Sequence, residues 1–464
     1  MAWNTDDKPN DIVSLTRDLC KYPTAVVSDS SSDFFARIQK ELPFQLHRYA
    51  SGITFNGWTV PQNWKIKKAT ISKNGKTIFD GMCHPLAVGY YSKSFRGSLN
   101  WDDLKPHLVT HPKLPDAHVF HCEWQYRPWQ ADWAFCIPRR IFETLGPGKY
   151  DVDLQTTYQP GEMLVGEYDL PGKSEKTIVF NAHTCHPHMA NDGFVGVATL
   201  IRLVQWLAGR DHFYTYRLVF GPEHLGTVFY LRNLPEEELN RLVCGAFVEM
   251  TGTGGPIKLA STFLGEQPID RALRHAARHH SASYVEVPWR CGAGNDETVW
   301  EAPGYEVPFV EATRCIDQFD PFPEYHTHLD TPDSLYVPHV DEFFLVLQKA
   351  VEILECNASM HRRFDGLLCL SNPQYDLYLE RPDPAVVKDL EADSEKWGHL
   401  LDSLFRYFDG SVTLLDVAET HDLPFDRLHA YLKRFAAKSL IDFERSVIPR
   451  HRFSRIGKRD QSAA

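Results

Sequence analysis

The stretch TIVFNAHTCHPHMANDGFVG, residues 177–196, joins a short apolar run to a group of side chains that can bind metal ions. The apolar run 177–180 predicts a buried strand, and the pattern of apolar residues over 195–207 predicts an amphipathic helix. The metal-capable residues between them are His183, Cys185, His186, His188 and Asp192. A strand, a polar loop and a helix in this order are typical of α/β proteins, whose functional groups collect at the carboxyl ends of strands.

The alternation of strands and helices continues from about residue 151 to residue 357. The further apolar runs are YRLVFGPE (216–223), LVCGAFVEM (242–250) and EVPFVEAT (306–313). Amphipathic patterns occur at 195–207, 268–280 and 340–354. These patterns predict an α/β fold in which helices cover a largely parallel sheet.

Two regions outside this pattern differ in composition. Residues 57–150 are dense in Trp, Tyr, Phe, Pro and Gly, and Asn74-Gly75 between two alternating runs predicts a β-hairpin. The residues after 366 show the order helix, short turn, helix and strand, which suits a winged-helix-like fold. The expected domains are an α/β domain (1–56 and 151–365), an inserted β-rich domain (57–150) and a winged-helix-like domain (366–464).

The composition of the 464 residues is that of an ordinary globular chain, with 43% hydrophobic and 24% charged residues. The formal net charge of −12 argues against a nucleic-acid surface, because phosphate binding needs clustered Lys and Arg. No apolar run approaches the ~18 residues needed to cross a bilayer, and the N-terminus lacks the features of a secretory signal. Ten cysteines without a CxxC pair are typical of reduced thiols. We therefore expect a cytoplasmic protein without a membrane partner.

Each predicted strand leads into residues that can bind a divalent metal. In chain order these are His183, His186, Asp192, Glu223, His224, Glu249, His326, His328 and Asp330. Zn²⁺ accepts imidazole and carboxylate ligands, and a catalytic zinc site keeps one position open for water. Bound zinc lowers the pKa of that water towards ~7, and a nearby carboxylate that is not a ligand can then take its proton.

Each of these residues also has a structural explanation. Asp192 precedes a helix and could cap it, Glu249 could be a buried acid paired with an arginine, and the loop histidines could face solvent. Cys185 is more typical of a small packed thiol than of a nucleophile. Ligand types at four successive strand ends are difficult to obtain by chance, so their joint occurrence favours a metal site.

Four motifs occur in one order along the chain: AHTCHPHMANDGFVG (182–196), GPEHLG (221–226), FVEMTG (247–252) and EYHTHLDT (324–331). In this order they resemble the M28-type zinc aminopeptidases. The chain looks closer still to bacterial aminopeptidase-like proteins that carry an inserted β-domain and a C-terminal winged helix and are associated with polysaccharide biosynthesis. The resemblance implies an aminopeptidase-like mixed sheet flanked by helices and a zinc-dependent hydrolase.

The resemblance also implies roles for single residues. Asp192 matches the carboxylate that bridges two metals or serves one, and Glu223 matches the general base. Glu249 and His326 match metal ligands. The segment GAGNDETVW (292–300) resembles a family loop that lines the substrate site. The candidate substrate-binding residues are Asp296, Glu297 and Tyr325, and the two acids could equally be solvated loop charges.

Three positions leave a choice open or depart from the family pattern. His183 corresponds to the first ligand by its place at the strand end, and His186 is an alternative or an addition. Position 224 is a glutamate ligand in typical M28 enzymes and is His224 here, which can still bind zinc. Cys185 stands where those enzymes have the aspartate that orients the first histidine. We expect one zinc ion and leave a second open.

Three functions are compatible with these residues. The first is a hydrolase of aminopeptidase type, in which zinc-activated water attacks an amide carbonyl and Glu223 acts as the base. The second is an amidase or deacylase that acts on an amino sugar or another small amide. The third is a non-catalytic scaffold or regulator that uses the winged helix and a basic C-terminal tail. The expected partner is a small peptide, aminoacyl or amino-sugar amide, and a homo-oligomer is left open.

Overall fold

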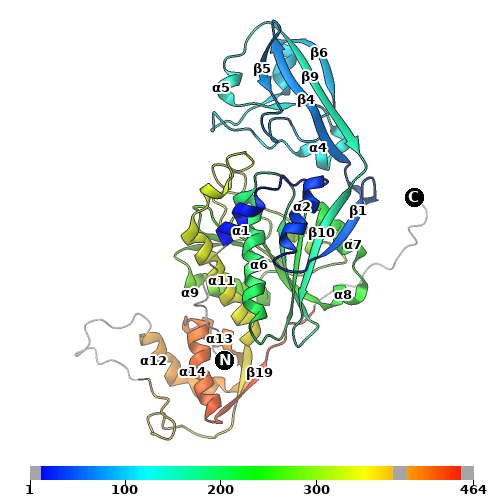
Figure 1. The fold of residues 1–464 in the computed structure, drawn as a ribbon. Helices are drawn as coiled ribbons and strands as arrows, with labels where there is room; N and C mark the ends of the chain where they lie inside the picture. The colour runs from blue at the N-terminus through cyan, green and yellow to red at the C-terminus, as the bar shows by residue number, and fades with distance from the viewer. Residues whose placement is uncertain (1–11, 380–393, 451–464) are drawn as a thin grey trace, which may run out of the picture.

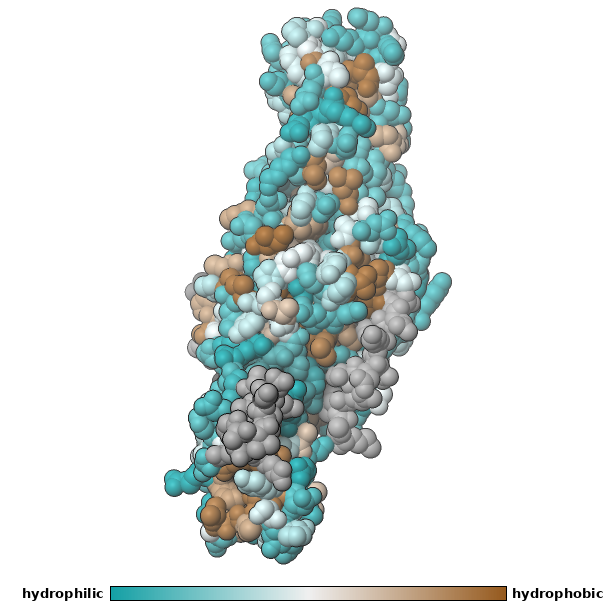
Figure 2. Space-filling view, turned by 90° about the vertical axis from the view of Figure 1, so that its left-hand side faces the viewer, coloured by the Kyte–Doolittle hydropathy of each residue, from teal (hydrophilic) through white to brown (hydrophobic). Residues whose placement is uncertain are grey.

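The computed structural model describes residues 12–379 and 394–450. Figure 1 shows a large central body of strands and helices, a β-rich part above it and a smaller, mainly helical part below it. Figure 2 shows a face that is mostly hydrophilic, on which hydrophobic residues form small separate patches. Within the described ranges, no helix combines the length and the apolar character needed to cross a membrane.

An eight-stranded sheet forms the central body, in the order β1-β10-β12-β11-β13-β16-β14-β15. Its strands are β1 (Gln45–Ala50), β10 (Glu162–Leu170), β11 (Thr177–His183), β12 (Thr215–Gly221), β13 (Leu242–Val248), β14 (Ile257–Ala260), β15 (Tyr284–Val287) and β16 (Phe309–Thr313). The four neighbours β12, β11, β13 and β16 are parallel, whereas β10 and β14 pair with them antiparallel. The predicted α/β fold, with a large mixed sheet flanked by helices, is confirmed.

Helices cover both faces of this sheet, so its central strands are buried. Along β11, Ile178 and Phe180 face a larger apolar core, and Val179 faces a smaller one. Before the C-terminal part, the helices of the larger core are α1 (Ile12–Leu19), α2 (Asp29–Ile38), α6 (Val195–Ala208), α9 (Pro268–His280) and α11 (Val337–Cys356). Those of the smaller core are α7 (Leu225–Asn233), α8 (Glu236–Arg241) and α10 (Glu297–Trp300). Packing on both faces fixes the strand ends, as is usual for parallel sheets.

A second sheet of four antiparallel strands is formed by the region predicted as a β-rich insertion (57–150) together with residues 151–159, which follow it. Its order is β5-β4-β9-β6, with β4 (Asn63–Lys73), β5 (Lys76–Asp80), β6 (Phe95–Asn100) and β9 (Lys149–Gln159). β4 and β5 pair around Asn74 and Gly75, both in the left-handed region, which confirms the predicted hairpin. This sheet has its own apolar core, which includes Trp64, Phe135 and Tyr150.

Short elements complete the same region. They are β2 (Thr54–Phe55), β3 (Trp58–Thr59), α3 (Trp101–Leu104), β7 (Leu108–Val109), α4 (Glu123–Tyr126), β8 (Phe135–Cys136) and α5 (Arg139–Phe142). In Figure 1, α4 lies at the lower edge of the β-rich part, next to the central body. The domain boundaries themselves stay a prediction.

The C-terminal part combines helices with a three-stranded antiparallel sheet. Its elements are β17 (Ala358–Arg362), α12 (Ser394–Ser403), β18 (Asp409–Thr413), α13 (Leu414–His421), α14 (Phe425–Ala437) and β19 (Ile441–Arg445). The predicted order of helix, turn, helix and strand is present, with Asp422 in the left-handed region between α13 and α14. Leu428 and Phe435 of α14 belong to the same apolar core as α11. The winged-helix assignment stays a prediction.

Candidate metal centre

The candidate metal-binding residues lie at the carboxyl edge of the parallel strands. His183 is the last residue of β11, Glu223 follows β12 by two residues, and Glu249 directly follows β13. Asp192 lies in a single π turn that opens α6, and His326 lies in the loop between β16 and α11. Because parallel strands end at the same edge of a sheet, segments far apart in sequence meet there.

The first donor group consists of His183, Asp192 and Glu249, and we call it the sheet-held group because two of its members are placed by strand ends. The Nε2 of His183 lies 2.6 Å from Oε2 of Glu249 and 3.8 Å from Oδ1 of Asp192. All three side chains are buried. Burial raises the pKa of Glu249 to about 8. Burial acts to lower the pKa of His183, but Cys185 and Glu249 outweigh it and raise this pKa. The pair therefore keeps a proton at neutral pH.

The second donor group consists of His186, Asp192 and His326, and we call it the loop-held group because both histidines lie in loops. Both Nε2 atoms face Oδ2 of Asp192, at 2.8 Å from His186 and 3.4 Å from His326. The Nδ1 of His186 donates to the carbonyl of Pro187 at 3.0 Å, since a carbonyl only accepts. Without a second proton, Nε2 of His186 would therefore point a lone pair at a carboxylate. A proton or a metal cation between the two atoms removes this repulsion.

Both groups fit a divalent metal in the chemistry of their atoms. In each, three ligand atoms lie within 4.8 Å of one another, and all are imidazole nitrogens or carboxylate oxygens, which zinc accepts. The Oε1 of Glu249 is buried without a hydrogen-bond partner, which costs free energy that a bound cation would recover. Burial lowers the pKa of His326 to about 4, so its imidazole is neutral at pH 7 and can act as a ligand. Asp192 belongs to both groups and is placed to bridge them.

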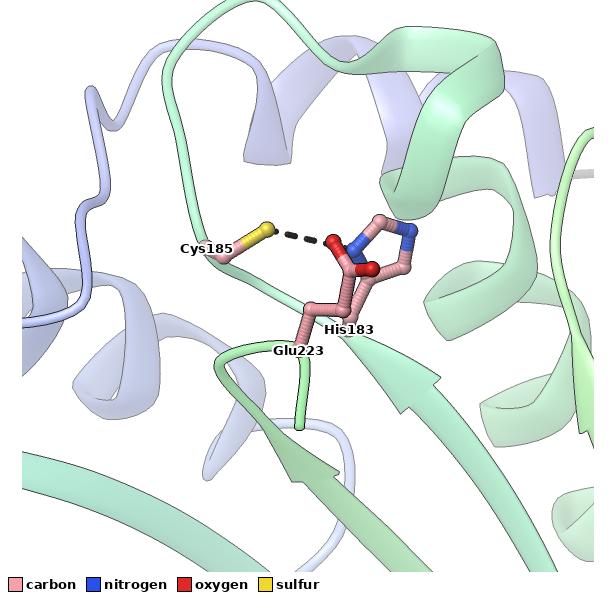
Figure 3. Close-up of side chains that lie close together, drawn as sticks. All are labelled: His183, Cys185 and Glu223. Atoms are coloured by element: carbon pink, nitrogen blue, oxygen red, sulfur yellow. Dashed lines mark hydrogen bonds between the residues drawn. The ribbon is translucent and has the colours of Figure 1, made fainter. Parts of the chain in front are cut away.

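Cys185 and Glu223 lie on the Nδ1 side of the His183 ring (Figure 3). The Nδ1 is 3.2 Å from Sγ of Cys185, and burial raises the pKa of this thiol, which is neutral at pH 7. Glu223 projects from the loop after β12 towards the same ring, and its side chain is 28% exposed. Cys185 thus takes the place of a partner that orients His183, while Glu223 stays partly open to solvent.

His224 belongs to neither donor group. Its backbone has a φ of 52°, and its ring stacks on Trp58 with the centroids 6.1 Å apart. Its Nδ1 is 3.6 Å from Oε1 of Glu223. His186, and not His224, is the residue that joins Asp192 and His326. A metal-binding role of His224 stays a prediction.

Asp296, a candidate substrate-binding residue, makes its hydrogen bonds within the protein. Its carboxylate accepts from the backbone N–H of His224 and from the hydroxyl of Thr227, both at 2.5 Å. Burial raises the pKa of Asp296 above its ordinary value. The carboxylate therefore fixes the turn that carries Glu223. A direct contact of Asp296 with substrate stays a prediction.

Of the other two candidates, Tyr325 contacts a residue of the centre directly, whereas Glu297 reaches it through Asn295, whose Nδ2 donates to Oε2 of Glu249 at 3.4 Å. Glu297 accepts from the guanidinium of Arg290 at 3.0 Å and from the backbone N–H of Asn295 at 2.8 Å. The ring of Tyr325 stacks on His326 with the centroids 3.9 Å apart. Both residues are thus placed at the centre, and their role towards substrate stays a prediction.

Two further carboxylates support the centre. Asp330 accepts from the backbone N–H groups of Asn191 and Asp192, at 2.8 and 3.0 Å. Glu311 accepts in the same way from the backbone at 293 and 294, at 2.6 and 2.9 Å. The signal that could have found Glu311 is an acid inside an apolar strand, because a buried charge needs partners.

Phe120, from the inserted region, lies against the loop-held group. Its ring stacks on His186, with the centroids 4.2 Å apart, and meets His326 edge-on at 5.4 Å. The sequence carries no local signal for this contact, because Phe120 is one of many aromatic residues within 57–150.

The fold and the two donor groups together define an α/β protein with candidate ligands for a metal. The chain belongs to the family described as "Domain of unknown function (DUF4910)", which matches residues 13–357.

Three comparisons place the chain among related proteins and folds. It is 28% identical over 332 residues to the Clostridium acetobutylicum "Putative polysaccharide biosynthesis protein with aminopeptidase-like domain", covering 70% of this chain and 74% of that protein. A crystal structure of a "putative peptidase" from Clostridium acetobutylicum matches with 23% identity and a TM-score of 0.77, over 93% of this chain and 96% of that one. The zinc aminopeptidase of Bacillus subtilis matches with 14% identity and a TM-score of 0.55, over 75% and 95%. The fold is therefore that of M28-type peptidases and aminopeptidases.

Proposed function

We propose that this chain is a zinc-dependent hydrolase of aminopeptidase type. The observation that carries the proposal is the sharing of the buried Asp192 by two donor groups, with the carboxylate of Glu223 beside them. Zinc held there would supply a Lewis acid for a substrate carbonyl and would lower the pKa of water. We propose one ion in the sheet-held group and a second in the loop-held group.

The residues of the chain divide the remaining work. The two donor groups hold the centre, and Asp330 and Cys185 keep Asp192 and His183 in position. Glu223 accepts a proton from the attacking water and passes it to the leaving amine. Its partial exposure suits this role, because it must meet both water and substrate. Asp296 fixes the turn from which Glu223 projects.

Two kinds of amide are candidates for the substrate. The likeness of the fold to a zinc aminopeptidase supports a peptide or aminoacyl amide. The name of the Clostridium relative, with its polysaccharide biosynthesis, supports the acyl amide of an amino sugar. A non-catalytic role would use the basic tail, residues 445–460, of which 451–460 lie outside the described residues. The cytoplasmic location stays a prediction.

The test is hydrolysis by the zinc-loaded protein of a panel of aminoacyl anilides and N-acetylated amino sugars. Glu223→Gln keeps the shape of the side chain and removes the base, so we expect zinc to stay bound and kcat to fall about 10²- to 10⁴-fold. Full activity in this variant would contradict the proposed base. Activity on one class of amide and not the other decides the substrate.

A further inference from the structure

The inserted region reaches the loop-held group through a short ladder of backbone hydrogen bonds. Val119 forms an antiparallel bridge with Thr327. The N–H of Phe120 donates to the carbonyl of His326 at 2.7 Å, and the N–H of His328 donates to the carbonyl of His118 at 3.1 Å. The loop that carries a metal-ligand candidate is therefore paired like a strand with a segment from another part of the chain.

The side chain of Phe120 adds a second link, to both histidines of the loop-held group. It is 5% exposed, and it contacts the face of His186 and, edge-on, His326. The rings of His186 and His326 are themselves nearly perpendicular, at 89°, with centroids 5.4 Å apart. Phe120 thus occupies the space into which either imidazole would turn.

Four more histidines lie where the inserted region contacts the loops that carry His186 and His326. The rings of His84 and His118, from the inserted region, lie 4.4 to 5.1 Å from those of His188 and His328 in the pairs that make contact. Nε2 of His84 is 3.0 Å from Nε2 of His188, and the N–H of His118 donates to Nδ1 of His328 at 3.1 Å. His188 and His328 each follow a loop-held ligand candidate by two residues. Both ligand loops are therefore tied to the inserted region a second time.

This histidine cluster is not arranged as a ligand set. The Nδ1 of His84 accepts from the N–H of Leu86 at 3.0 Å, and the Nδ1 of His328 accepts from the N–H of His118. A neutral imidazole that accepts at Nδ1 carries its proton on Nε2, so neither Nε2 offers a lone pair to a metal. The cluster joins two parts of the chain and leaves metal binding to the adjacent groups.

The two donor groups differ in what keeps their imidazoles in place. His183 is fixed by β11 and by its bonds to Glu249 and Cys185. His326 has a φ of 51° in a long loop, and its side chain is 31% exposed. The torsion that turns an imidazole ring is broad, so packing decides the direction of the ligand nitrogen.

We propose that Phe120 is a positioning residue for the loop-held metal, so that the inserted region is a working part of the metal centre. The inference rests on the proposed function, because it assumes that His186 and His326 bind zinc. Phe120 keeps both Nε2 atoms directed at Asp192, and the backbone ladder keeps His326 within reach. The sheet-held group does not need this support.

The experiment compares zinc binding by full-length Phe120→Ala, Phe120→Tyr and His186→Ala with that of the unaltered protein. Elemental analysis counts the ions, and competition with a chelator gives their affinities. We expect Phe120→Ala to weaken the ion that His186→Ala removes by about 10- to 100-fold, the range for residues that orient ligands. Phe120→Tyr keeps the ring and is expected to bind zinc as the unaltered protein does. Activity of Phe120→Ala should return when zinc is raised.

The matched control is Phe95→Leu in β6 of the second sheet, which changes the stacked pair of Phe95 with Trp133, whose centroids are 4.5 Å apart. It perturbs the same region away from the ligands and is expected to leave zinc affinity unchanged. If Phe120→Ala does not fold, Phe120→Leu makes the same comparison with a smaller loss of packing. Unchanged affinity in the folded variant would overturn this inference alone. An unaltered protein that binds no zinc would overturn the proposed function with it.

Discussion

The sheet-held and loop-held groups share Asp192, but the chain supports them by different means. In the sheet-held group, His183 and Glu249 are placed by the ends of β11 and β13, and their side chains are at most 2% exposed. In the loop-held group, His186 and His326 lie in loops, and their rings pack against Phe120. One half of the centre is therefore a product of the central sheet alone, and the other half depends on the inserted region.

Asp192 belongs to both groups. It is held in position both by the helix start that carries it and by a loop residue, Asp330. The π turn that carries it opens α6, and Asp330 accepts the backbone N–H groups at its start. Burial acts to raise the pKa of Asp192, but His186 outweighs it and holds this pKa well below its ordinary value. The carboxylate is thus ionised and positioned before any metal arrives.

The largest effect is expected from Asp192→Asn, because both groups depend on this charge. The variant keeps the size of the side chain, so we expect loss of zinc from both groups and a fall in hydrolysis on the order of 10³-fold or more. Elemental analysis and steady-state rates measure the two effects. Asp211→Asn, at an exposed ion pair with Lys173, is the control and should change neither. One zinc ion held at full affinity in Asp192→Asn would show that the groups are independent.

The next comparison is between His186→Ala and His224→Ala. His186 faces Asp192, whereas His224 stacks on Trp58, so we expect the first variant to lose one ion and the second to keep both. Loss of the loop-held ion should lower kcat by about 10²-fold or more, and His224→Ala should lower it less than about 10-fold. Zinc content and kcat of the two purified variants are measured together. The reverse result would show that His224, and not His186, binds the second ion. The division into a sheet-held and a loop-held group would then be wrong.

The sheet-held group is the part of the centre that the sequence predicts best. Apolar runs of strand length ended in His183 and just before Glu223 and Glu249, and parallel pairing brought those ends together. The pattern works because periodicity reports burial, and burial places the strand. Local sequence was enough to place the candidate ligands that stand at the end of a buried strand.

The loop-held group could be predicted only in part. His186 and His224 are both histidines next to a strand end, and the choice between them depends on loop torsions, such as the φ of 52° at His224, that no periodicity reports. Phe120 is 66 positions away from His186 and belongs to a different sheet region, so its contact has no local signal. The inserted region was predicted as a module but not as a neighbour of the candidate metal ligands.

The substitution Cys185→Asp changes the support of the sheet-held group alone, because Cys185 contacts His183. An aspartate would accept from Nδ1 of His183 more strongly than a neutral thiol, and this makes Nε2 more basic. We expect the sheet-held ion to bind about 10- to 100-fold more tightly and the loop-held ion to keep its affinity. Chelator competition measures both affinities, with Cys185→Ser as the matched polar control. Weaker zinc binding in Cys185→Asp would mean that a second buried negative charge near Glu223 costs more free energy than the better orientation of His183 contributes.

The smallest expected effect is a difference in proton release between the two groups. The pKa of Glu249 is raised to about 8 by burial, so the metal-free pair with His183 holds a proton at pH 7 that zinc must displace. The pKa of His326 is lowered to about 4, so this ligand has no proton to release at pH 7. Below pH 8, the affinity of the sheet-held group should therefore rise with pH by up to about tenfold per unit and level off above it. Calorimetry of zinc binding in buffers of different ionisation enthalpy, with His186→Ala to isolate the sheet-held ion, measures the proton. An affinity that is flat between pH 6 and pH 8 would mean that the metal-free pair holds no proton, with Glu249 ionised and His183 neutral. The burial that raises the pKa of Glu249 would then be compensated within the protein itself.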